Sequence, residues 1–146
     1  MLPAISEHDL IWMAGLMEVE ASFYPGSPNG ASSNLPWVAL KMTDRDVVDR
    51  VGRLWGVSTM TERRPDPKHK DAYTIRARGR RAVIIMWLVL PYMGRRRARR
   101  IREVLDTAAF HKSGPRKVPE VVATADDFKE EAEKLVCACR AGVLAL

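Results

Sequence analysis

Two stretches of alternating apolar and polar residues, 37–42 and 73–78, constrain the fold of this chain most strongly. In the first stretch, every second residue is apolar, which places Val38, Leu40 and Met42 on one side of an extended chain. Successive side chains of a strand point to opposite faces of a sheet. Each stretch therefore predicts a half-buried strand whose other face is open to solvent or to a partner.

Segments of helical periodicity alternate with these strands. The expected elements are, in chain order, a helix from Ser6 to about Ala21, strands at 22–24 and 37–42, a helix opened by residues 43–46 and ended by Gly56, strands at 57–63 and 73–78, and helices at 80–90 and 95–106. The order contains two successive strand–strand–helix units. It predicts an α+β fold, an αββαββα saddle-like domain in which helices back an antiparallel sheet.

The domain boundaries follow from changes in composition along the chain. Residues 1–110 are expected to form the α+β domain, and 111–123, which include His111-Lys112-Ser113-Gly114-Pro115, are expected to form a linker. Residues 124–146 are predicted to form a C-terminal amphipathic helix. Its acidic and basic residues nearly balance, so we expect it to pack on the domain or on a partner chain.

The net charge of +6 is concentrated in one stretch of the chain. Residues 63–102 carry 14 basic and two acidic residues, whereas the segments on either side are net negative. Five arginines between 95 and 100 fall at a helix start, where the macrodipole favours anions. A solvated surface is the alternative interpretation of such a cluster, but the overall charge favours a polyanionic partner such as nucleic acid.

Several classes of protein are disfavoured. The longest apolar run, residues 82–93, is shorter than the roughly 20 residues of a membrane-spanning helix, so it predicts a buried helix and no membrane partner. The N-terminal residues do not resemble a secretory signal, and an intracellular protein is expected, cytoplasmic (prokaryotic or phage-encoded) or organellar. Cys137 and Cys139 have no second Cys or His pair at zinc-ligand spacing, and they are interpreted as core thiols.

Residues 13–21 read MAGLMEVEA and are followed by Ser22-Phe23. This segment resembles the LAGLIDADG motif, with identities at Ala14, Gly15 and Leu16, and so resembles the LAGLIDADG homing endonucleases. The resemblance extends over about residues 8–106. It includes MTDRDVVDRVGRLWG between the two predicted hairpins and LPYMGRRRARRI at the start of the basic helix.

The resemblance implies a homodimeric, site-specific double-strand DNA endonuclease. Small residues let two motif helices cross closely, which would place Ala14 and Gly15 at the dimer interface. The acid at the eighth motif position, here Glu20, would bind Mg²⁺ or another divalent cation and act in catalysis. A basic residue after the Pro-Tyr turn would lie near the cleaved phosphate; Arg96 fits best, with Arg95 and Arg97 as close competitors.

The DNA-binding residues are expected in two groups. The sheet-face residues Trp37, Lys41, Arg76 and Arg78 would read base pairs in the major groove, since a two-stranded ribbon fits there. The phosphate-binding residues would be Lys68 and Lys70 on the basic turn, together with Arg95, Arg97, Arg99 and Arg100.

Two departures from the motif keep other functions open. Val19 and Ala21 stand where the motif has Ala or Gly and then Gly, and both add bulk where the helices approach. A DNA- or RNA-binding protein that does not cleave, such as a regulator or an intron maturase, is therefore an alternative, as is an interaction protein. Glu18 lies about 200° around the helix from Glu20 and is interpreted as structural or cap-stabilising.

Overall fold

The structure is a computed structural model that describes the backbone of residues 2–26, 35–111 and 121–144, with side chains up to Val136 in the last helix. Helix α1 (Glu7–Glu20) leads into strands β1 (Ala21–Tyr24) and β2 (Trp37–Met42), and α2 (Arg45–Trp55) leads into β3 (Met60–Glu62) and β4 (Ala72–Arg78). Helix α3 (Gly79–Val89), the 3₁₀ turn η1 (Leu90–Tyr92) and α4 (Arg95–Thr107) follow. The predicted α+β class and element order are confirmed.

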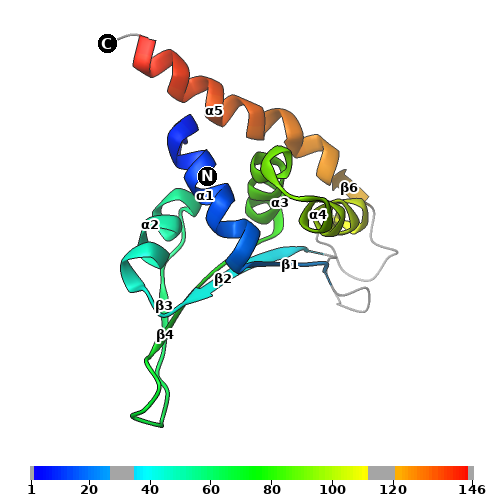
Figure 1. Cartoon of the computed structure of the whole chain (residues 1–146). Helices are drawn as coiled ribbons and strands as arrows, with labels where there is room; N and C mark the ends of the chain where they lie inside the picture. Colours follow the sequence, from blue (N-terminus) through cyan, green and yellow to red (C-terminus); the bar gives the residue numbers. More distant parts are fainter. Residues whose placement is uncertain (1, 27–34, 112–120, 145–146) are drawn as a thin grey trace.

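One antiparallel sheet, with strand order β1-β2-β4-β3, supports the helices on a single face (Figure 1). Its covered face carries Val38 and Leu40 of β2 and Ile75 and Ala77 of β4, all buried. Helices α1, α2 and α3 pack against these two central strands, and α4 contacts β1. The β3–β4 hairpin extends beyond this body, so its basic turn projects away from the helices (Figure 1).

Helix α3 lies in the centre of the helical layer. Almost all of its residues from Ala82 to Val89 are buried, which explains why residues 82–93 form the longest apolar run. The helix ends where Pro91 enters the 3₁₀ turn. Within the described ranges, every helix is too short or too polar to cross a bilayer.

The first helix begins where the sequence predicts, and a side-chain network fixes it to α2. The Ser6 hydroxyl accepts a hydrogen bond from the Asp9 amide at 3.0 Å. Arg50 donates to the Asp9 carboxylate at 2.9 Å and lies over the Trp12 ring. The hydrogen bonds from Arg50 and then from Ser6 hold the pKa of Asp9 below its ordinary value. The predicted cap of α2 differs, because Asp44 makes no side-chain capping bond.

The C-terminal region contains strands that the sequence analysis did not anticipate. Strand β5 (Ala109–His111) pairs with β6 (Val121–Thr124), so the end of the segment expected as a linker, 111–123, is a strand. The rest of that segment, 112–120, lies outside the described residues. The 3₁₀ turn η2 (Ala125–Phe128) then leads into α5 (Lys129–Leu144).

Helix α5 crosses the helical layer on the side away from the sheet (Figure 1) and packs on α3, as expected for an amphipathic helix. Trp87 of α3 donates its indole N–H to the Ala125 carbonyl at 2.8 Å. Arg80 Nε donates to Glu131 at 3.1 Å, and the guanidinium lies over the Phe128 ring. The side chains of Cys137 and Cys139 lie outside the described part of the structure.

The left-handed conformation at Gly56 gives a test of how α2 ends. Gly56 has φ 66° and ψ 36° and ends α2 before the second hairpin. A Cβ in this conformation is strained by about 1–2 kcal/mol. Gly56→Ala should lower the free energy of unfolding by that amount in urea titrations followed by circular dichroism. Ser58→Ala, at an exposed coil position, should change it by less than about 0.5 kcal/mol; equal effects would contradict the assigned conformation.

Candidate nucleic-acid interface

The uncovered face of the sheet brings together the four residues predicted to read base pairs. In the strand register Trp37 lies opposite Arg78, and Lys41 lies opposite Thr74. Trp37 is partly exposed, whereas Lys41, Arg76 and Arg78 are exposed. The face opposite the helices is therefore polar and basic.

An aromatic stack organises one end of this face. The rings of Tyr24 on β1 and Trp37 on β2 are stacked, with centroids 3.7 Å apart and planes at 13°. The Arg76 guanidinium lies 5.3 Å from the centroid of the Trp37 ring. The indole ring can hold the Arg76 guanidinium by a cation–π contact. The N–H groups of the guanidinium then stay available for a ligand. Tyr24 was not among the predicted residues, although its place in a strand before a loop could have indicated it.

Lys41 differs from Arg76 and Arg78, the other basic residues on this face, because it forms an ion pair with a described acid. Its ammonium lies 2.6 Å from the Glu62 carboxylate on β3. The hydrogen bond from Lys41 lowers the pKa of Glu62 below its usual value. Lys68 and Lys70, by contrast, are exposed on the turn at the tip of the β3–β4 hairpin, and neither side chain has an ion-pair partner within the described ranges.

Helices α1 and α4 cap each other. The Arg97 guanidinium, from the first turns of α4, donates to three carbonyls at the end of α1: Glu18 at 2.9 Å, Val19 at 3.1 Å, and Ala21. In return, the Glu18 carboxylate accepts a hydrogen bond at 3.0 Å from the amide of Gly94, the N-cap of α4. Each charge lies at the helix end whose dipole it stabilises.

This exchange assigns Glu18 and Arg97 to the scaffold. Glu18 has the cap-stabilising role that was predicted for it. Arg97 was predicted to bind DNA, but the structure directs its guanidinium to backbone carbonyls of its own chain. The contact joins residues almost eighty positions apart in sequence, and an arginine inside an arginine run gives no local signal that one member is structural.

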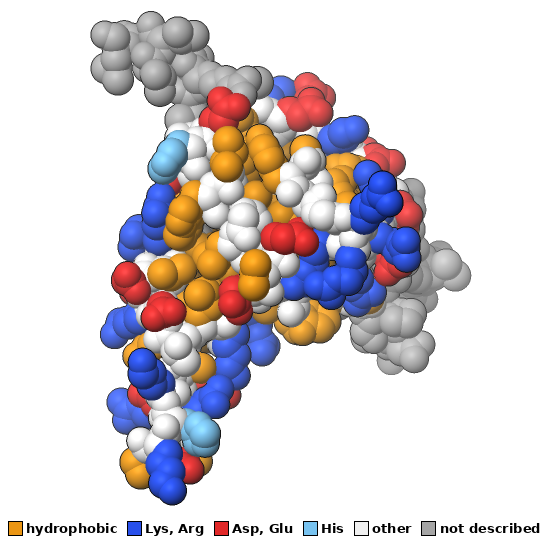
Figure 2. Space-filling view, in the orientation of Figure 1, with side chains coloured by type: hydrophobic (Ala, Val, Ile, Leu, Met, Phe, Trp, Pro, Cys, Tyr) orange, Lys and Arg blue, Asp and Glu red, His pale blue; other side chains and the backbone are white. Residues whose placement is uncertain are grey.

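The other basic residues of α4 divide by their contacts. Arg100 donates to the Phe23 carbonyl at 3.1 Å and lies 3.5 Å from Glu103. Arg95 and Arg99 line a shallow depression on the outer side of α4. Arg96 is exposed and makes no hydrogen bond or ion pair with the described residues. Lys and Arg side chains gather over α4 and along the hairpin (Figure 2).

Glu20, the last residue of α1, is exposed. Its carboxylate has no hydrogen-bond or ion-pair partner in the described part of the chain, so its oxygens are available to a cation, which prefers oxygen ligands. The described residues contain no cluster of three or more His, Cys, Asp or Glu that could hold a metal ion. One chain therefore offers Glu20 as a single carboxylate ligand, and a cation site built on it requires ligands from elsewhere.

The outer side of α1 is apolar, but it does not contain both predicted interface residues. Gly15 is exposed, and a Cβ added to it would meet nothing within 4 Å. Ala14 is 1% exposed and faces the core of its own chain, which corrects its assignment to a dimer interface. Ile11 and Val19, 51% and 70% exposed, lie one turn before and one turn after Gly15. Hydrophobic side chains gather over this helix (Figure 2).

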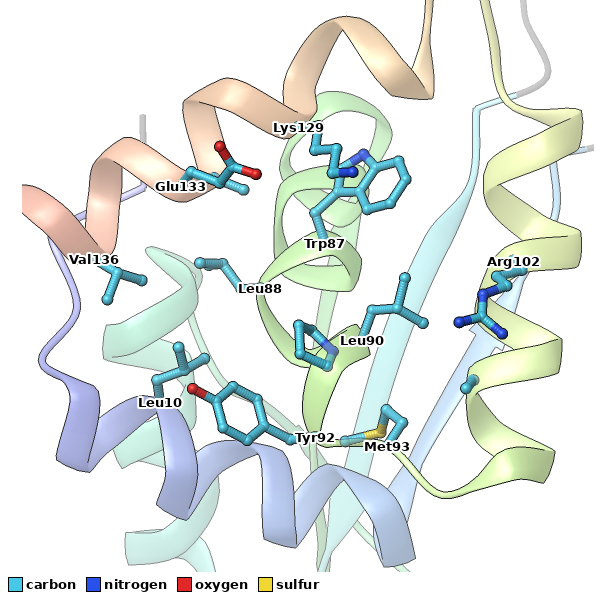
Figure 3. A pocket seen from close by; sticks show the side chains of 13 residues that line it. Leu10, Trp87, Leu88, Leu90, Tyr92, Met93, Arg102, Lys129, Glu133 and Val136 are labelled. Carbon is cyan, nitrogen blue, oxygen red and sulfur yellow. The ribbon is translucent and has the colours of Figure 1, made fainter.

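A separate groove of about 570 Å³ is lined by residues of α1, α3, η1, α4 and α5 (Figure 3). Its walls are mainly apolar, with Leu10, Leu88 and Val136 on one side and Trp87 beside Lys129 on another. None of the residues predicted from the sequence to act in binding or catalysis lines it. The groove is therefore distinct from the basic sheet face.

Comparison with solved structures finds similar shapes among homing endonucleases. One is I-CvuI in complex with the I-CreI target, with Mg present and the DNA not cleaved (12% identity, TM-score 0.49, covering 88% of this chain and 95% of that chain). Another is I-CvuI with its own target in the presence of Ca (13% identity, TM-score 0.48, covering 88% of this chain and 94% of that chain). A third is the archaeal intron-encoded I-Vdi141I complexed with DNA (12% identity, TM-score 0.46, covering 88% of this chain and 97% of that chain). No protein-family model and no curated protein matches the chain.

Neighbouring arginines test the mutual capping of α1 and α4. Arg97→Ala removes the donors of three carbonyls and should lower the free energy of unfolding by about 2 kcal/mol in urea titrations, since hydrogen bonds from charged groups are the stronger ones. Arg96→Ala is the matched control and should change it by less than about 0.5 kcal/mol. A larger loss for Arg96→Ala than for Arg97→Ala would reverse the two assignments.

Proposed function

We propose that this protein is a homodimeric, metal-dependent, site-specific double-strand DNA endonuclease of the homing-endonuclease kind. The observation that carries the proposal is the position of Glu20. An exposed carboxylate that has no partner among the described residues ends α1, directly before the first strand of a sheet whose open face carries Trp37, Arg76 and Arg78. A carboxylate that is able to bind a divalent cation, placed beside a surface suited to nucleic acid, supports metal-dependent phosphodiester hydrolysis.

In this proposal the sheet face lies in the major groove of the target. Arg76, held against the Trp37 ring, addresses a base edge, and Arg can bind guanine in bidentate fashion. Lys68 and Lys70 on the projecting hairpin, together with Arg95, Arg99 and the remaining guanidinium donors of Arg100, bind phosphates and set the position of the duplex.

Catalysis would then depend on the end of α1. Glu20 would hold Mg²⁺ or a similar divalent cation beside the scissile phosphate. When bound, such an ion activates water and stabilises the leaving 3′ oxygen. Arg96 would stabilise negative charge that develops on the phosphate. The bond from phosphorus to the 3′ oxygen breaks as water adds, giving a 5′ phosphate and a 3′ hydroxyl.

Two chains are needed because each supplies one Glu20 and a duplex has two strands. Gly15 allows close approach of a second α1, and Ile11 and Val19 provide the apolar contacts on either side of it. A pair of α1 helices packed through this stripe would bring two Glu20 residues near the two-fold axis, which implies a target with two-fold or nearly two-fold symmetry.

A protein that binds DNA or RNA without cutting is the alternative. Arg97 occupies the carbonyls of Glu18, Val19 and Ala21, so the oxygens of these three residues are already hydrogen-bonded at the place where a cation would bind. This arrangement leaves fewer ligands for a cation and favours the alternative. It does not affect the basic sheet face, on which binding depends in both cases.

Two exposed apolar residues of equal exposure test the dimer. Ile11 and Met60 are each 51% exposed, on α1 and on β3. Ile11→Lys should weaken dimerisation by at least roughly thirty-fold, the loss expected when about 2 kcal/mol of apolar burial is removed. Met60→Lys should leave it unchanged. Sedimentation of both variants over a range of concentrations measures this, and a wild type that stays monomeric even on DNA would refute the dimer.

Two glutamates on the same helix end test catalysis. Glu20→Gln keeps the shape but removes the charge that would hold the cation, so the cleavage rate should fall by about two orders of magnitude or more, with DNA affinity intact or higher. Glu18→Gln keeps an oxygen that can accept from the Gly94 amide and should still cut.

The substrate for this assay comes from a randomised duplex library incubated with wild type, with and without Mg²⁺, followed by sequencing of bound and cut molecules. Single-turnover time courses on the selected duplex then compare the variants. Binding without cutting would replace the nuclease by the alternative, and neither binding nor cutting would refute both.

A further inference from the structure

A cleft lies along a part of the sheet edge that the proposed function has not used. Strand β3 pairs with β4 only opposite Ala72, Tyr73 and Thr74. Beyond Thr74, the described part of the structure places no further strand along this edge of β4. The cleft that runs along it has a volume of about 500 Å³, and Val57 forms part of its wall.

Four arginines line this cleft. Arg76 and Arg78 come from the end of β4, and Arg80 and Arg81 come from the first turn of α3. Glu131 of α5 is the one acidic residue in the lining. The first turn of α3 contains no acid, and the side chain of its N-cap residue, Arg78, makes no capping hydrogen bond. The cleft therefore has a strong excess of positive charge.

Contacts hold three of the four guanidinium groups in place. Arg81 donates to the Gly56 carbonyl at 2.9 Å, and Arg80 is bound by Glu131. Arg76 is held over the Trp37 ring. Among the four, only Arg80 forms an ion pair with a described residue; Arg76, Arg78 and Arg81 form none with these residues. Guanidinium groups that are already positioned lose less side-chain entropy when they bind an anion.

We propose that this cleft binds a phosphate of the DNA backbone beside the base pairs that lie on the sheet. Arg76 and Arg78 belong both to the open sheet face and to the cleft, so a duplex seated on the face brings its backbone past this edge. Planar guanidinium groups match the geometry of phosphate oxygens. The inference rests on the proposed DNA binding, but it does not depend on cleavage.

Two variants with opposite expected effects test the proposal. Arg81→Gln should reduce the slope of log affinity against log salt by about 0.9, the value for one phosphate contact on duplex DNA. It should lower the affinity for all DNA sequences equally. Glu131→Gln removes the competing acid and should increase both affinity and slope. A variant that merely disturbs folding would not gain affinity. Arg53→Gln, on the exposed side of α2, is the charge-matched control and should match wild type.

Neutral methylphosphonate substitutions, scanned along the selected duplex, should locate the phosphate. At one position per half-site, the methylphosphonate should lower the DNA affinity of wild type as much as Arg81→Gln lowers it on the unmodified duplex. Combining the modified duplex with Arg81→Gln should cause no further loss of affinity. Fluorescence anisotropy measures both series.

If Arg81→Gln and Glu131→Gln leave the slope of log affinity against log salt unchanged on a duplex that wild type binds, the cleft does not bind a DNA phosphate. That result would leave the proposed function intact. In that case, inorganic phosphate and polyglutamate are tested as ligands. If phosphate stabilises wild type but not Arg81→Gln against unfolding, the cleft binds a free anion; if polyglutamate does so, the cleft binds an acidic peptide. A wild type with no duplex affinity would overturn both proposals.

Discussion

The exchange of charges between α1 and α4 is the interaction on which the candidate site depends. Arg97 binds the carbonyls at the end of one helix and Glu18 binds the first amide of the other, so a single pair of residues satisfies backbone groups at both helix ends and joins the two helices. The exchange also explains how α4 can begin with consecutive arginines despite the positive end of its dipole. One of these arginines serves a second helix, and an acid from that helix faces the amide of Gly94.

Local patterns predicted the parts of the fold that depend on neighbouring residues. Alternation placed β2 at its observed bounds, because the period of two directly reflects burial of Val38 and Leu40. The motif resemblance had assigned Ala14 to a dimer interface, whereas the structure places it on the inner face of α1 with Met13 and Met17.

Interactions between distant segments could not be predicted in this way. The Arg97 contacts join two helices through backbone carbonyls, and any residue type would supply those acceptors. Strand β6 pairs with β5 across a separate stretch of chain, and its four residues are too few for a clear period. The arginine-lined cleft depends on where β3 stops pairing, which composition does not reveal. The basic residues were thus identified from sequence more readily than their individual roles.

The ion pair between Arg80 and Glu131 joins the C-terminal helix to the first turn of α3, beside the arginine-lined cleft. If an anion in the cleft draws on Arg80, it competes with Glu131 for the same guanidinium, so occupancy of the cleft and docking of α5 become thermodynamically coupled. Such coupling is reciprocal: whatever loosens α5 would strengthen anion binding by the same factor. The docking of a surface helix would then set the affinity of the cleft for the anion.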